Sequence, residues 1–494
     1  MDPHAPMPVE ATETHISRLF FTPDRVHKLL KPIATGFLDH RSVAARLAAI
    51  EREYELNRRL APDVYLGVTP LSEGGETVDA MLTMRRLPEG RRLVALVGTE
   101  EFDPALRAVA RSIATFHAGL DPVTTPTQMA GTEGLHELWN SSFAEMEADR
   151  GTVIDADEFD RVRHYVDDYL GHAPHLFRLR QEQGWVRDGH GDLTAADIFV
   201  LDDGPRILDC LAFSDEMRIC DVLADIAFLV MDVHRLAGMA AAQRLMGWYT
   251  EFTGEHHPGS LAHHYVAYRA HVRAKVEILR HRQGEPDAAD RARAYHRLAL
   301  DHLVRARLRV VVVGGGPGTG KTTLAHEIGQ QAGWMVLTSD EIRKDLAGVE
   351  HLTHVDVEPG TGMYDEGTTD ATYRRLVELG GVALEAGASV VLDASWSSAD
   401  HRTLAAELAE AHGADLIELE CRLPADEAKR RVLARRRDEP TASDARPEVV
   451  DYLRARRDPW PSAVGVDTSE TVSDAADTTI ATVWHHCTVH VRRG

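Results

Sequence analysis

The chain has 494 residues, of which 44% are hydrophobic and 27% charged, and its formal net charge is −23. This length predicts two or three globular domains, and the acidic charge disfavours non-specific binding to nucleic acid and to anionic membranes. The four cysteines form no Cys-x-x-Cys pair, and we find neither a signal peptide nor an apolar run that could span a bilayer, so we expect a cytoplasmic protein without disulfides or cysteine zinc modules.

The first half of the chain is predicted to combine short strands with many helices, as an α+β domain does. Residues 1–14 are expected to be loose. From the alternation and the helical spacing of apolar residues we expect, in chain order, strands over 16–21 and 25–30, a helix over 42–60, a strand over 78–84, mainly helices over 102–183, a Gly-rich turn and a hairpin over 185–209, and helices over 222–308.

The composition changes near residue 307. A charged helix rich in Ala and Arg (287–307) runs into Arg309–Val313, an apolar strand of the kind found in buried parallel sheets. We therefore divide the chain into a loose N-terminus (1–14), a first domain (15–306) and a second domain (307–494). Strands and helices of the second domain are predicted to alternate as a doubly wound α/β fold with a parallel sheet, over 310–313, 322–332, 335–337, 372–386, 389–392, 399–412 and 414–420.

A P-loop, the Walker A motif that binds nucleoside triphosphates, follows the first of these strands. Its glycines let backbone N–H groups curl around phosphate oxygens, Lys321 reaches the β- and γ-phosphates, and the Thr322 hydroxyl binds Mg²⁺. The alternative is a chance Gly-rich turn, but the motif lies between a strand of four valines and an amphipathic helix, as its function requires. The predicted nucleotide-binding residues are Gly315, Gly316, Pro317, Gly318, Thr319, Gly320, Lys321, Thr322 and Thr323.

Polar residues at the ends of two further strands are expected to complete this site. Asp340 follows the second strand, where its carboxylate could orient an acceptor hydroxyl or accept its proton, and Arg343 lies one helical turn later. The alternative is a helix cap followed by a solvated arginine. Asp393 ends the third strand in the manner of a Walker B aspartate that helps to hold Mg²⁺; the alternative is a polar residue that only closes the strand.

A basic run at residues 429–437 interrupts the acidic sequence. On a helix, Arg431 and Arg435 share a face and are expected to belong to a lid over the triphosphate. The alternative is a solvated helix whose arginines pair with Asp426 and Glu427. The position of the run, after the fourth strand and before a polar loop, favours the lid.

The segments GGGPGTGKTT, SDEIR and VVLDAS, with the basic run, resemble the small P-loop kinases, a group that includes polynucleotide kinases, the zeta-toxin group and chloramphenicol-phosphotransferase-like kinases. The resemblance covers about residues 309–458. It implies that Asp340 is the catalytic base and that Arg343 lies beside the phosphates.

The first domain carries a second candidate site. The sequence His190–Leu193 (HGDL) precedes the predicted hairpin, and Asp209 follows the hairpin's second strand. Two carboxylates that bracket a hairpin suit phosphoryl transfer, because Asp192 can orient a hydroxyl while Asp209 holds metal. The alternative for HGD alone is an ordinary hydrogen-bonded turn braced by His190. Asp197 stands where an Asn that binds the second metal is expected.

Residues upstream of this turn strengthen the interpretation. Lys28 resembles the strand lysine of protein-kinase-like folds, and Glu53 is its expected partner on the following helix, with Glu51 and Glu55 as rivals by spacing. Met84–Pro88 falls where the hinge between two lobes is expected.

These features resemble the aminoglycoside phosphotransferase family over about residues 15–236, and the order VHKLLKP, GFLDH, LNRRLAPDVYLGV, MRRLP, HGDL and ILDCLAF resembles bacterial fusions of such a domain with a P-loop kinase. The resemblance implies a two-lobed protein-kinase-like fold in which Asp192 is the base or orienting group and Lys28 contacts the α- and β-phosphates. It also implies that Asp197 and Asp209 hold Mg²⁺. The sequence departs from the family in two ways: no GxGxxG loop precedes Lys28, and Asp197 replaces Asn. A degenerate, non-catalytic first domain is therefore an alternative.

The sequence as a whole predicts a phosphotransferase with two kinase-like domains, which uses ATP and Mg²⁺ to phosphorylate a hydroxyl of a small molecule. Two alternatives stay open. One is 5′-hydroxyl polynucleotide kinase activity in the second domain, which the basic run favours and the net charge opposes. The other is a nucleotide-gated regulator whose first domain is degenerate. The sequence predicts no membrane partner, and it indicates neither the acceptor nor the oligomeric state.

Overall fold

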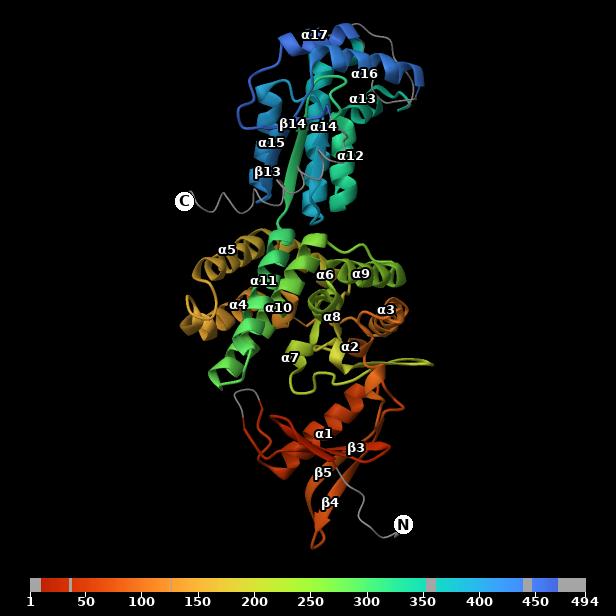
Figure 1. The fold of residues 1–494 in the computed structure, drawn as a ribbon, viewed down its shortest axis with the longest axis vertical. Coiled ribbons are helices and arrows are strands. Elements are labelled where there is room, and N and C mark those ends of the chain that lie inside the picture. The colour runs from red at the N-terminus through yellow and green to blue at the C-terminus, as the bar shows by residue number, and fades with distance from the viewer. Residues whose placement is uncertain (1–9, 35–37, 126, 352–360, 439–446, 470–494) are drawn as a thin grey trace. The chain divides into compact units, whose positions relative to one another are not determined.

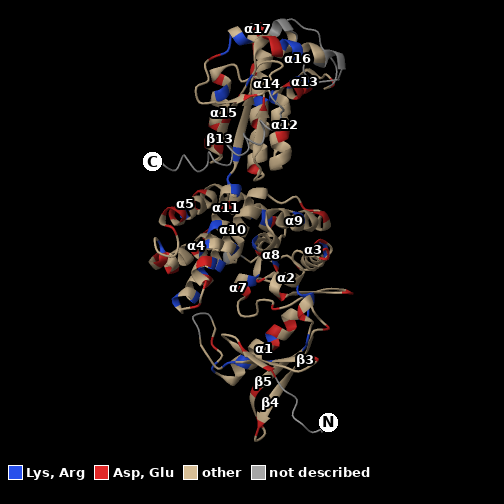
Figure 2. Cartoon of the chain, in the orientation of Figure 1, with Lys and Arg blue, Asp and Glu red and all other residues tan. Residues whose placement is uncertain are grey.

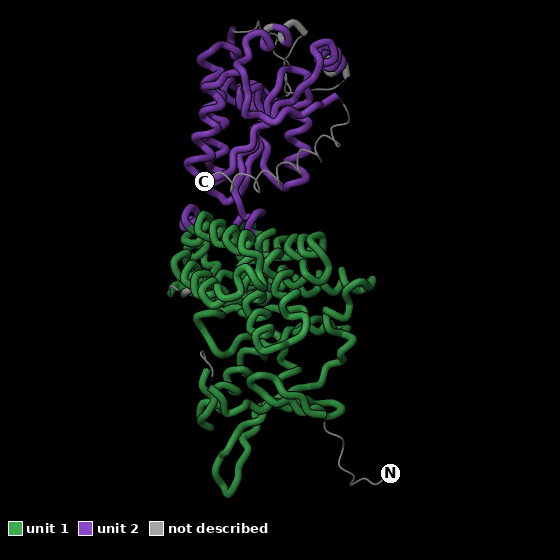
Figure 3. Tube along the Cα trace, turned by 60° about the vertical axis from the view of Figure 1, so that its left-hand side comes forward, with its two compact units in different colours: residues 1–170, 177–257, 262–302 green, residues 171–176, 258–261, 303–494 purple. Residues whose placement is uncertain are grey.

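The structure, a computed structural model, describes residues 10–34, 38–125, 127–351, 361–438 and 447–469 (Figure 1). The chain divides into two compact units (Figure 3). The N-terminal unit comprises residues 1–170, 177–257 and 262–302, and the C-terminal unit comprises residues 171–176, 258–261 and 303–494. The last boundary between them falls inside the helix α11 (Ala288–Ala306).

The N-terminal unit begins with a small lobe built on an antiparallel sheet. Its strands lie in the order β1-β2-β3-β5-β4, with the bounds β1 (Glu10–Glu13), β2 (Ser17–Phe21), β3 (Arg25–Leu30), β4 (Tyr65–Glu73) and β5 (Glu76–Arg85). Helix α1 (Val43–Asn57) packs on this sheet, and Ile50 meets Leu30 and Leu82 in a buried core. The helix begins where the Ser42 hydroxyl accepts a hydrogen bond from the backbone N–H of Ala45.

Two strands of this lobe differ from the sequence prediction. Glu10–Glu13, which we expected to be loose, form β1, because their backbone pairs antiparallel with β2 although all four side chains are exposed. A strand without a buried face carries no hydrophobic alternation, so the sequence pattern could not reveal it. Strand β4 was also missed, and its burial is irregular along its length.

The rest of the N-terminal unit is mostly helical. Two short pairs of strands interrupt it: β6 (Val186–Asp188) with β9 (Ile219–Asp221), and β7 (Ile198–Leu201) with β8 (Gly204–Ile207), the predicted hairpin. The helices are α2 (Leu93–Leu96), α3 (Phe102–Ala118), α4 (Thr132–Met146), α5 (Ala156–His172), α6 (Pro174–Glu182), α7 (Asp215–Arg218), α8 (Val222–Ala237), α9 (Met239–Thr253), α10 (Gly259–Arg282) and α11. Nearly every residue of α8 is buried, so this helix lies at the centre of the lobe.

The C-terminal unit contains a parallel sheet with the strand order β11-β12-β10-β13-β14. Its elements are β10 (Arg309–Gly314), α12 (Lys321–Ala332), β11 (Met335–Thr338), α13 (Ser339–Ala347), α14 (Glu366–Glu385), β12 (Val390–Asp393), α15 (Ala399–Ala411), β13 (Asp415–Arg422), α16 (Ala425–Asp438), α17 (Pro447–Ala455) and β14 (Val464–Asp467). The edge strand β14 was not predicted, since only one of its four residues is buried.

Helices cover both faces of this sheet, as predicted for a doubly wound fold. Along the fully buried strand β10, Val310 and Val312 pack with residues of α14 and α15, whereas Val311 and Val313 pack with residues of α12. The alternation of side chains along a strand produces this division. The carboxyl ends of β10, β11 and β12 therefore share one edge, where Val313 and Thr338 both pair with Asp393.

Charged residues are distributed over both units. Figure 2 shows Lys and Arg interspersed with Asp and Glu along the helices of each unit. Among the described residues, no helix has the length and apolar character needed to cross a membrane.

Candidate active sites

The P-loop forms the tight turn between β10 and α12. Gly315 and Gly318 have φ angles of +155° and +75°, which side chains rarely allow. A Cβ atom on Gly318 would lie 2.4 Å from the carbonyl oxygen of Ala428. The Thr319 hydroxyl donates to the carbonyl of Gly316 (2.8 Å) and so fixes the turn. The loop is therefore preformed, and it leads directly into the positive end of a twelve-residue helix.

Asp393 lies beside this loop in a buried position. It is 1% exposed, and neither of its carboxylate oxygens has a hydrogen-bond partner of normal geometry among the described residues. Burial raises the pKa of Asp393, against the charge of Lys321 and the nearby hydroxyl of Thr322, while the charge of Asp340 adds to the rise. A buried carboxylate without a partner, next to a hydroxyl and a glycine cradle, fits a site for nucleotide-bound Mg²⁺.

Asp340 and Arg343 lie on α13, which follows β11 directly. No side chain caps this helix, so the alternative of a simple N-cap at Ser339 or Asp340 is not observed. Asp340 is partly exposed in the first turn. Arg343 is buried, and its Nη1 donates to the carbonyl of Met363 (2.9 Å) and to the Thr369 hydroxyl (3.2 Å). It is thus held by the segment that leads into α14 and is not a solvated side chain.

The predicted lid residues lie on α16. Arg431 donates from Nη2 to the carbonyl of Thr468 (2.9 Å), and its Nε lies 3.5 Å from Glu427. A Cβ atom on Gly320 would lie 3.7 Å from its Nη1, so the guanidinium is also next to the P-loop. Arg431 therefore pairs with Glu427, as the alternative expected, and also lies next to the P-loop, where a lid residue would have to lie. The side chain of Arg435 lies outside the described part of the structure.

A cavity of about 680 Å³ opens beside the P-loop and contains residues that the sequence analysis missed. Arg457 lines it, with Nη1 3.3 Å from Oε1 of Glu420 and Nη2 3.4 Å from the carbonyl of Ser395. Burial lowers the pKa of Arg457, and Glu420 opposes this effect. The available signal was the pair Arg454 and Arg457, of which the first lies in the last turn of α17 and the second just beyond that helix. The other polar lining residues include Ser397, Arg422 and Asp467.

In the N-terminal unit, Nζ of Lys28 on β3 lies 2.7 Å from Oε1 of Glu53 on α1. The rivals Glu51 and Glu55 are exposed on the same helix, so the fold selects Glu53. Burial favours the neutral amine of Lys28, but the carboxylates of Glu53 and Asp209 prevail and raise its pKa. No glycine occurs in the turn that precedes β3, which confirms the departure noted in the sequence.

Residues 190–197 form a loop that we call the catalytic loop. It contains the carboxylates of Asp192 and Asp197, and the charge of Asp209 acts on both. Burial raises the pKa of Asp192 to about 6, and burial followed by the charge of Asp209 raises that of Asp197 to about 6. The Thr194 hydroxyl donates to Oδ2 of Asp197 (2.6 Å). Asp209 has a φ angle of +63°, which is unusual for a residue other than glycine. The charge of Asp209 acts on Asp197, and a divalent metal held by these two carboxylates would stabilise their ionised forms.

The catalytic loop is held by α8, which sequence reasoning did not connect with the site. The backbone N–H groups of His190 and Gly191 donate to Oδ2 and Oδ1 of Asp225 (2.7 and 2.8 Å), and the N–H of Ala195 donates to Asp232 (3.0 Å). His190 also braces the loop, since its ring Nε2 donates to the carbonyl of Leu208 (3.1 Å). The available signal was two acidic residues, Asp225 and Asp232, within the otherwise apolar first twelve residues of α8.

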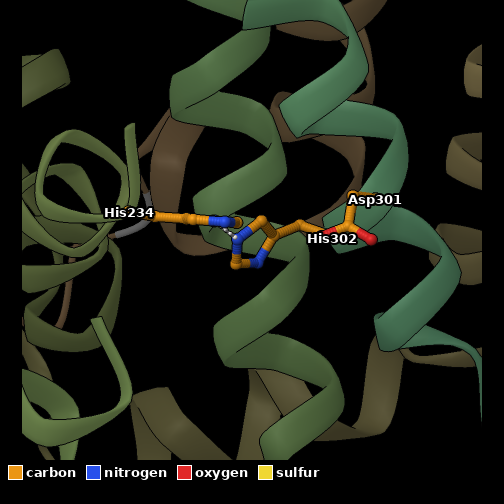
Figure 4. A group of neighbouring side chains, drawn as sticks. All are labelled: His234, Asp301 and His302. Carbon is orange, nitrogen blue, oxygen red and sulfur yellow. Dashed lines mark hydrogen bonds between the residues drawn. The ribbon is translucent and has the colours of Figure 1, made fainter. Parts of the chain in front are cut away.

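A group of His234, Asp301 and His302 offers ligand atoms that lie within 4.8 Å of one another (Figure 4). His302 uses both ring nitrogens in contacts at hydrogen-bond distance, with Nε2 2.8 Å from His234 Nδ1 and Nδ1 2.9 Å from His263 Nδ1. This arrangement forms a chain of imidazoles that joins α8, α10 and α11.

These sites define the class of the protein. A P-loop at the end of the first strand of a parallel sheet defines a P-loop domain, and residues 310–460 match the family described as an AAA domain. A lysine–glutamate pair in a small β-lobe, with a His-Gly-Asp loop in a helical lobe, defines a protein-kinase-like domain. The predicted architecture, a protein-kinase-like domain followed by a P-loop domain with a doubly wound parallel sheet, is confirmed.

The family follows from relatives that match along nearly the whole chain. Uncharacterized proteins of Mycobacterium tuberculosis (strains H37Rv and CDC 1551) and of Mycobacterium bovis are each 34% identical to this chain over 466 residues, which is 93% of this chain and 92% of theirs. The chain belongs to the same family as these mycobacterial proteins.

Solved structures of kinases are similar to parts of the chain. A choline/ethanolamine kinase family protein from Mesorhizobium loti is 14% identical with a TM-score of 0.39, covering 61% of this chain and 94% of that one. APH(2″)-IIia in complex with GDP and kanamycin is 17% identical with a TM-score of 0.38, covering 60% and 95%. A sugar kinase from Janibacter sp. HTCC2649 is 19% identical with a TM-score of 0.28, covering 36% and 94%.

Proposed function

We propose that this protein is an ATP-dependent phosphotransferase that transfers the γ-phosphoryl group of ATP to a hydroxyl of a small molecule, with one site in each unit. The observation that carries the proposal is the buried carboxylate of Asp393, whose oxygens form no hydrogen bond of normal geometry with any described residue and which lies beside Lys321 and Thr322. Burying an ionised carboxylate without a partner costs folding free energy. That cost is offset when Mg²⁺ bound to a nucleotide in the P-loop pairs with the carboxylate.

In the C-terminal unit, the acceptor oxygen would attack the γ-phosphorus while the bond from that phosphorus to the β,γ-bridging oxygen breaks and ADP leaves. Asp340 would orient the hydroxyl and accept its proton, and Lys321 would stabilise the negative charge on the phosphoryl oxygens. Mg²⁺, held by Thr322 and Asp393, would neutralise charge on the nucleotide.

In the N-terminal unit, Asp192 would play the part of the base. Its pKa of about 6, raised by burial, lets the carboxylate take up a proton near neutral pH more readily than an exposed aspartate does. Lys28 would position the α- and β-phosphates, and Asp197 with Asp209 would hold Mg²⁺. The described cysteines are unpaired and buried, which agrees with a reducing compartment such as the cytoplasm.

A second candidate function is a nucleotide-gated regulator. Two observations favour it. Asp197 adds a third carboxylate beside Asp192 and Asp209, so the site needs metal to balance its negative charge. The turn before β3 also contains no glycine. A regulator of this kind would bind ATP without transferring phosphate to an acceptor.

The test is acceptor-dependent ADP release by the full-length protein and by the variants Asp192→Ala and Asp340→Ala, over a library of sugars, nucleosides, aminoglycosides and 5′-hydroxyl oligonucleotides. Asp202→Ala and Glu341→Ala are controls, since Asp202 is an exposed carboxylate in the hairpin turn of the same unit and Glu341 is the exposed neighbour of Asp340. We expect an acceptor to stimulate ADP release and one of the two active-site variants to abolish it.

The outcome separates the candidates. Loss of acceptor-stimulated ADP release in only one variant identifies the working site, and stimulation by 5′-hydroxyl oligonucleotides alone identifies a polynucleotide kinase. ATP binding without stimulation by any acceptor, in the parent and in both variants, would contradict the phosphotransferase and favour the regulator.

A further inference from the structure

One face of α8 supports both the catalytic loop and two arginines of α10. Asp225 and Asp232 accept N–H groups of the catalytic loop, and Phe228 lies between them at a spacing that places all three on the same side of the helix. The guanidinium carbon of Arg269 lies 5.0 Å from the centre of the Phe228 ring, and that of Arg273 lies 5.9 Å from it. The two arginines therefore flank the catalytic loop.

The charges of Arg269 and Arg273 act on the carboxylate of Asp192 in the catalytic loop. Burial raises the pKa of Asp192, and the positive charge of Arg273, followed at a lower level by that of Arg269, opposes the rise. Arg273 is thus the cation with the largest influence on Asp192. Both the transferred phosphoryl group and the acceptor must come to this carboxylate during a reaction.

Neither arginine forms a direct ion pair with a described acidic residue of the N-terminal unit, although Tyr295 and the charges of Asp192 and Asp232 outweigh burial and raise the pKa of Arg273. Arg269 is 7% exposed; its Nε donates to the carbonyl of Ala224 (3.3 Å), and its Nη2 has no hydrogen-bond partner among the residues described. Arg273 is partly buried and is hydrogen-bonded to Tyr295. A guanidinium that is not held in a direct ion pair keeps N–H donors for an added anion, which would bind through charge-assisted hydrogen bonds.

We propose that the acceptor phosphorylated in the N-terminal unit carries an anionic group, a phosphate or a carboxylate, which Arg273 binds beside Asp192. This inference rests on the proposed phosphotransferase function. Arg269 lies too deep for direct contact and adds positive potential behind Arg273.

The first experiment measures binding and needs no knowledge of the acceptor. Full-length protein with the substitution Lys321→Ala, which weakens phosphate binding at the P-loop, is saturated with Mg²⁺ and the non-hydrolysable analogue AMPPNP. The γ-phosphate positions are then filled. Radiolabelled inorganic phosphate is added in equilibrium dialysis, and its dissociation constant is measured for the parent and for Arg273→Gln, Arg273→Lys and Arg280→Gln.

We expect Arg273→Gln to raise the dissociation constant of phosphate roughly tenfold or more, because a charge-assisted hydrogen bond is lost. Arg273→Lys should retain part of the affinity. Arg280→Gln should leave it unchanged, since Arg280 lies on the same helix but pairs with Glu277. Equal phosphate binding in the parent and in Arg273→Gln would overturn the inference. A loss of phosphate affinity in Arg273→Gln that is seen only with ADP in place of AMPPNP would also overturn the inference. ADP leaves the γ-phosphate position empty, so Arg273 would then bind the transferred phosphoryl group and not the acceptor.

The second experiment compares acceptors that differ only in an anionic group, such as glycerol with glycerol 3-phosphate and ribose with ribose 5-phosphate. We expect only the anionic member to stimulate ADP release, and Arg273→Gln to raise its KM while the KM of ATP is kept. Equal use of the neutral member would overturn the inference and leave the proposed function intact. An Arg273-dependent phosphate site without turnover on any acceptor would instead contradict the proposed function.

Discussion

Nζ of Lys28 lies 2.7 Å from Oε1 of Glu53, and the two side chains are only 12% and 10% exposed. This ion pair joins the central part of the small sheet to its one long helix in surroundings with little water. Such a pair stabilises the lobe mainly while both partners are present, because Glu53 alone would stay buried without a cation and Lys28 alone would keep only the weaker attraction of Asp209 and Asp197.

We therefore expect Lys28→Met and Glu53→Gln each to lower the free energy of unfolding of the small lobe by about 3 kcal/mol. The double variant should cost less than the sum of the two, since no single charge is left behind. Denaturant titration with hydrogen exchange at β3 and α1 measures this. Glu55→Gln, an exposed change on the same helix, should have little effect, and strictly additive costs would contradict the interpretation.

Asp225 is expected to be the residue on which the catalytic loop depends most. Burial favours its neutral form, but the hydrogen bond and charge of His117 and the loop N–H groups prevail and hold its pKa below the ordinary range. A depressed pKa stabilises the fold above the ordinary pKa of about 4, and this stabilisation is lost as the pH falls below it.

Asp225→Asn should thus cost the N-terminal unit about 3 kcal/mol at pH 7, and less as the pH falls below 4. It should also abolish turnover that depends on Asp192 while leaving turnover that depends on Asp340. Calorimetry over a pH series and the two assays measure these effects. A cost that is the same at pH 3 and at pH 7 would show that the carboxylate charge does not matter.

The C-terminal site was predictable because its information is local. The P-loop, its preceding strand and its following helix are contiguous in sequence, and the aspartates after β11 and β12 meet because parallel strands end at one edge. The N-terminal site was predictable only in part. Spacing left three glutamates as partners of Lys28, and only the packing of α1 on the sheet buries Glu53 and exposes the other two.

What the sequence could not provide depends on contacts between distant segments. Arg457 contacts Glu420 because the segment after α17 folds back beside β13. No sequence motif predicts a contact between these two residues. The basic partners of Asp192 come from α10, far along the chain, and are related to it only through Phe228 of α8. The edge strands β1 and β14 were not predicted because most of their side chains are exposed and so show no alternation of apolar and polar residues.

Gly318 is predicted to be irreplaceable, in contrast to another glycine with a similar backbone. Gly318 and Gly333 have φ angles of +75° and +71°, but a Cβ atom would meet the Ala428 carbonyl at 2.4 Å only at Gly318, and nothing within 4 Å at Gly333. Gly333→Ala should cost about 1 kcal/mol, the penalty of the left-handed conformation alone. Gly318→Ala should cost more and abolish ATP binding, as measured by thermal denaturation and by titration with Mg·ATP. Similar costs for the two would contradict the steric argument.

Asp393 should show a conflict between stability and ligand binding. Its folded-state pKa is raised, so the stability that its protonated form contributes is present below about pH 4 and is lost as the pH rises. Asp393→Asn removes the buried charge, and we expect the ligand-free protein to become more stable at pH 7. The variant should lose the increase in Tm that Mg·ATP gives the parent. A variant that is less stable without ligand but still responds to Mg·ATP would contradict the assignment of Asp393 to the metal.

His264 provides a prediction on acid stability that is independent of both sites. It stacks on Tyr169 with ring centres 4.4 Å apart, neither ring nitrogen has a hydrogen-bond partner in the described part of the chain, and burial lowers its pKa to about 3. Because the folded state keeps the ring neutral, its stability contribution is complete above about pH 6.5 and is lost as the pH falls toward 3.

His264→Phe removes this titration and keeps an aromatic ring in the same core. At pH 4.5 the neutral histidine costs about 3 kcal/mol relative to its protonated form in the unfolded chain, so the variant should unfold at a clearly lower pH than the parent. Acid titrations followed by tryptophan fluorescence measure the midpoint. His136→Gln, a change at an exposed histidine, should leave the midpoint in place. An unchanged midpoint in His264→Phe would mean that His264 becomes protonated in the folded state without disrupting the core.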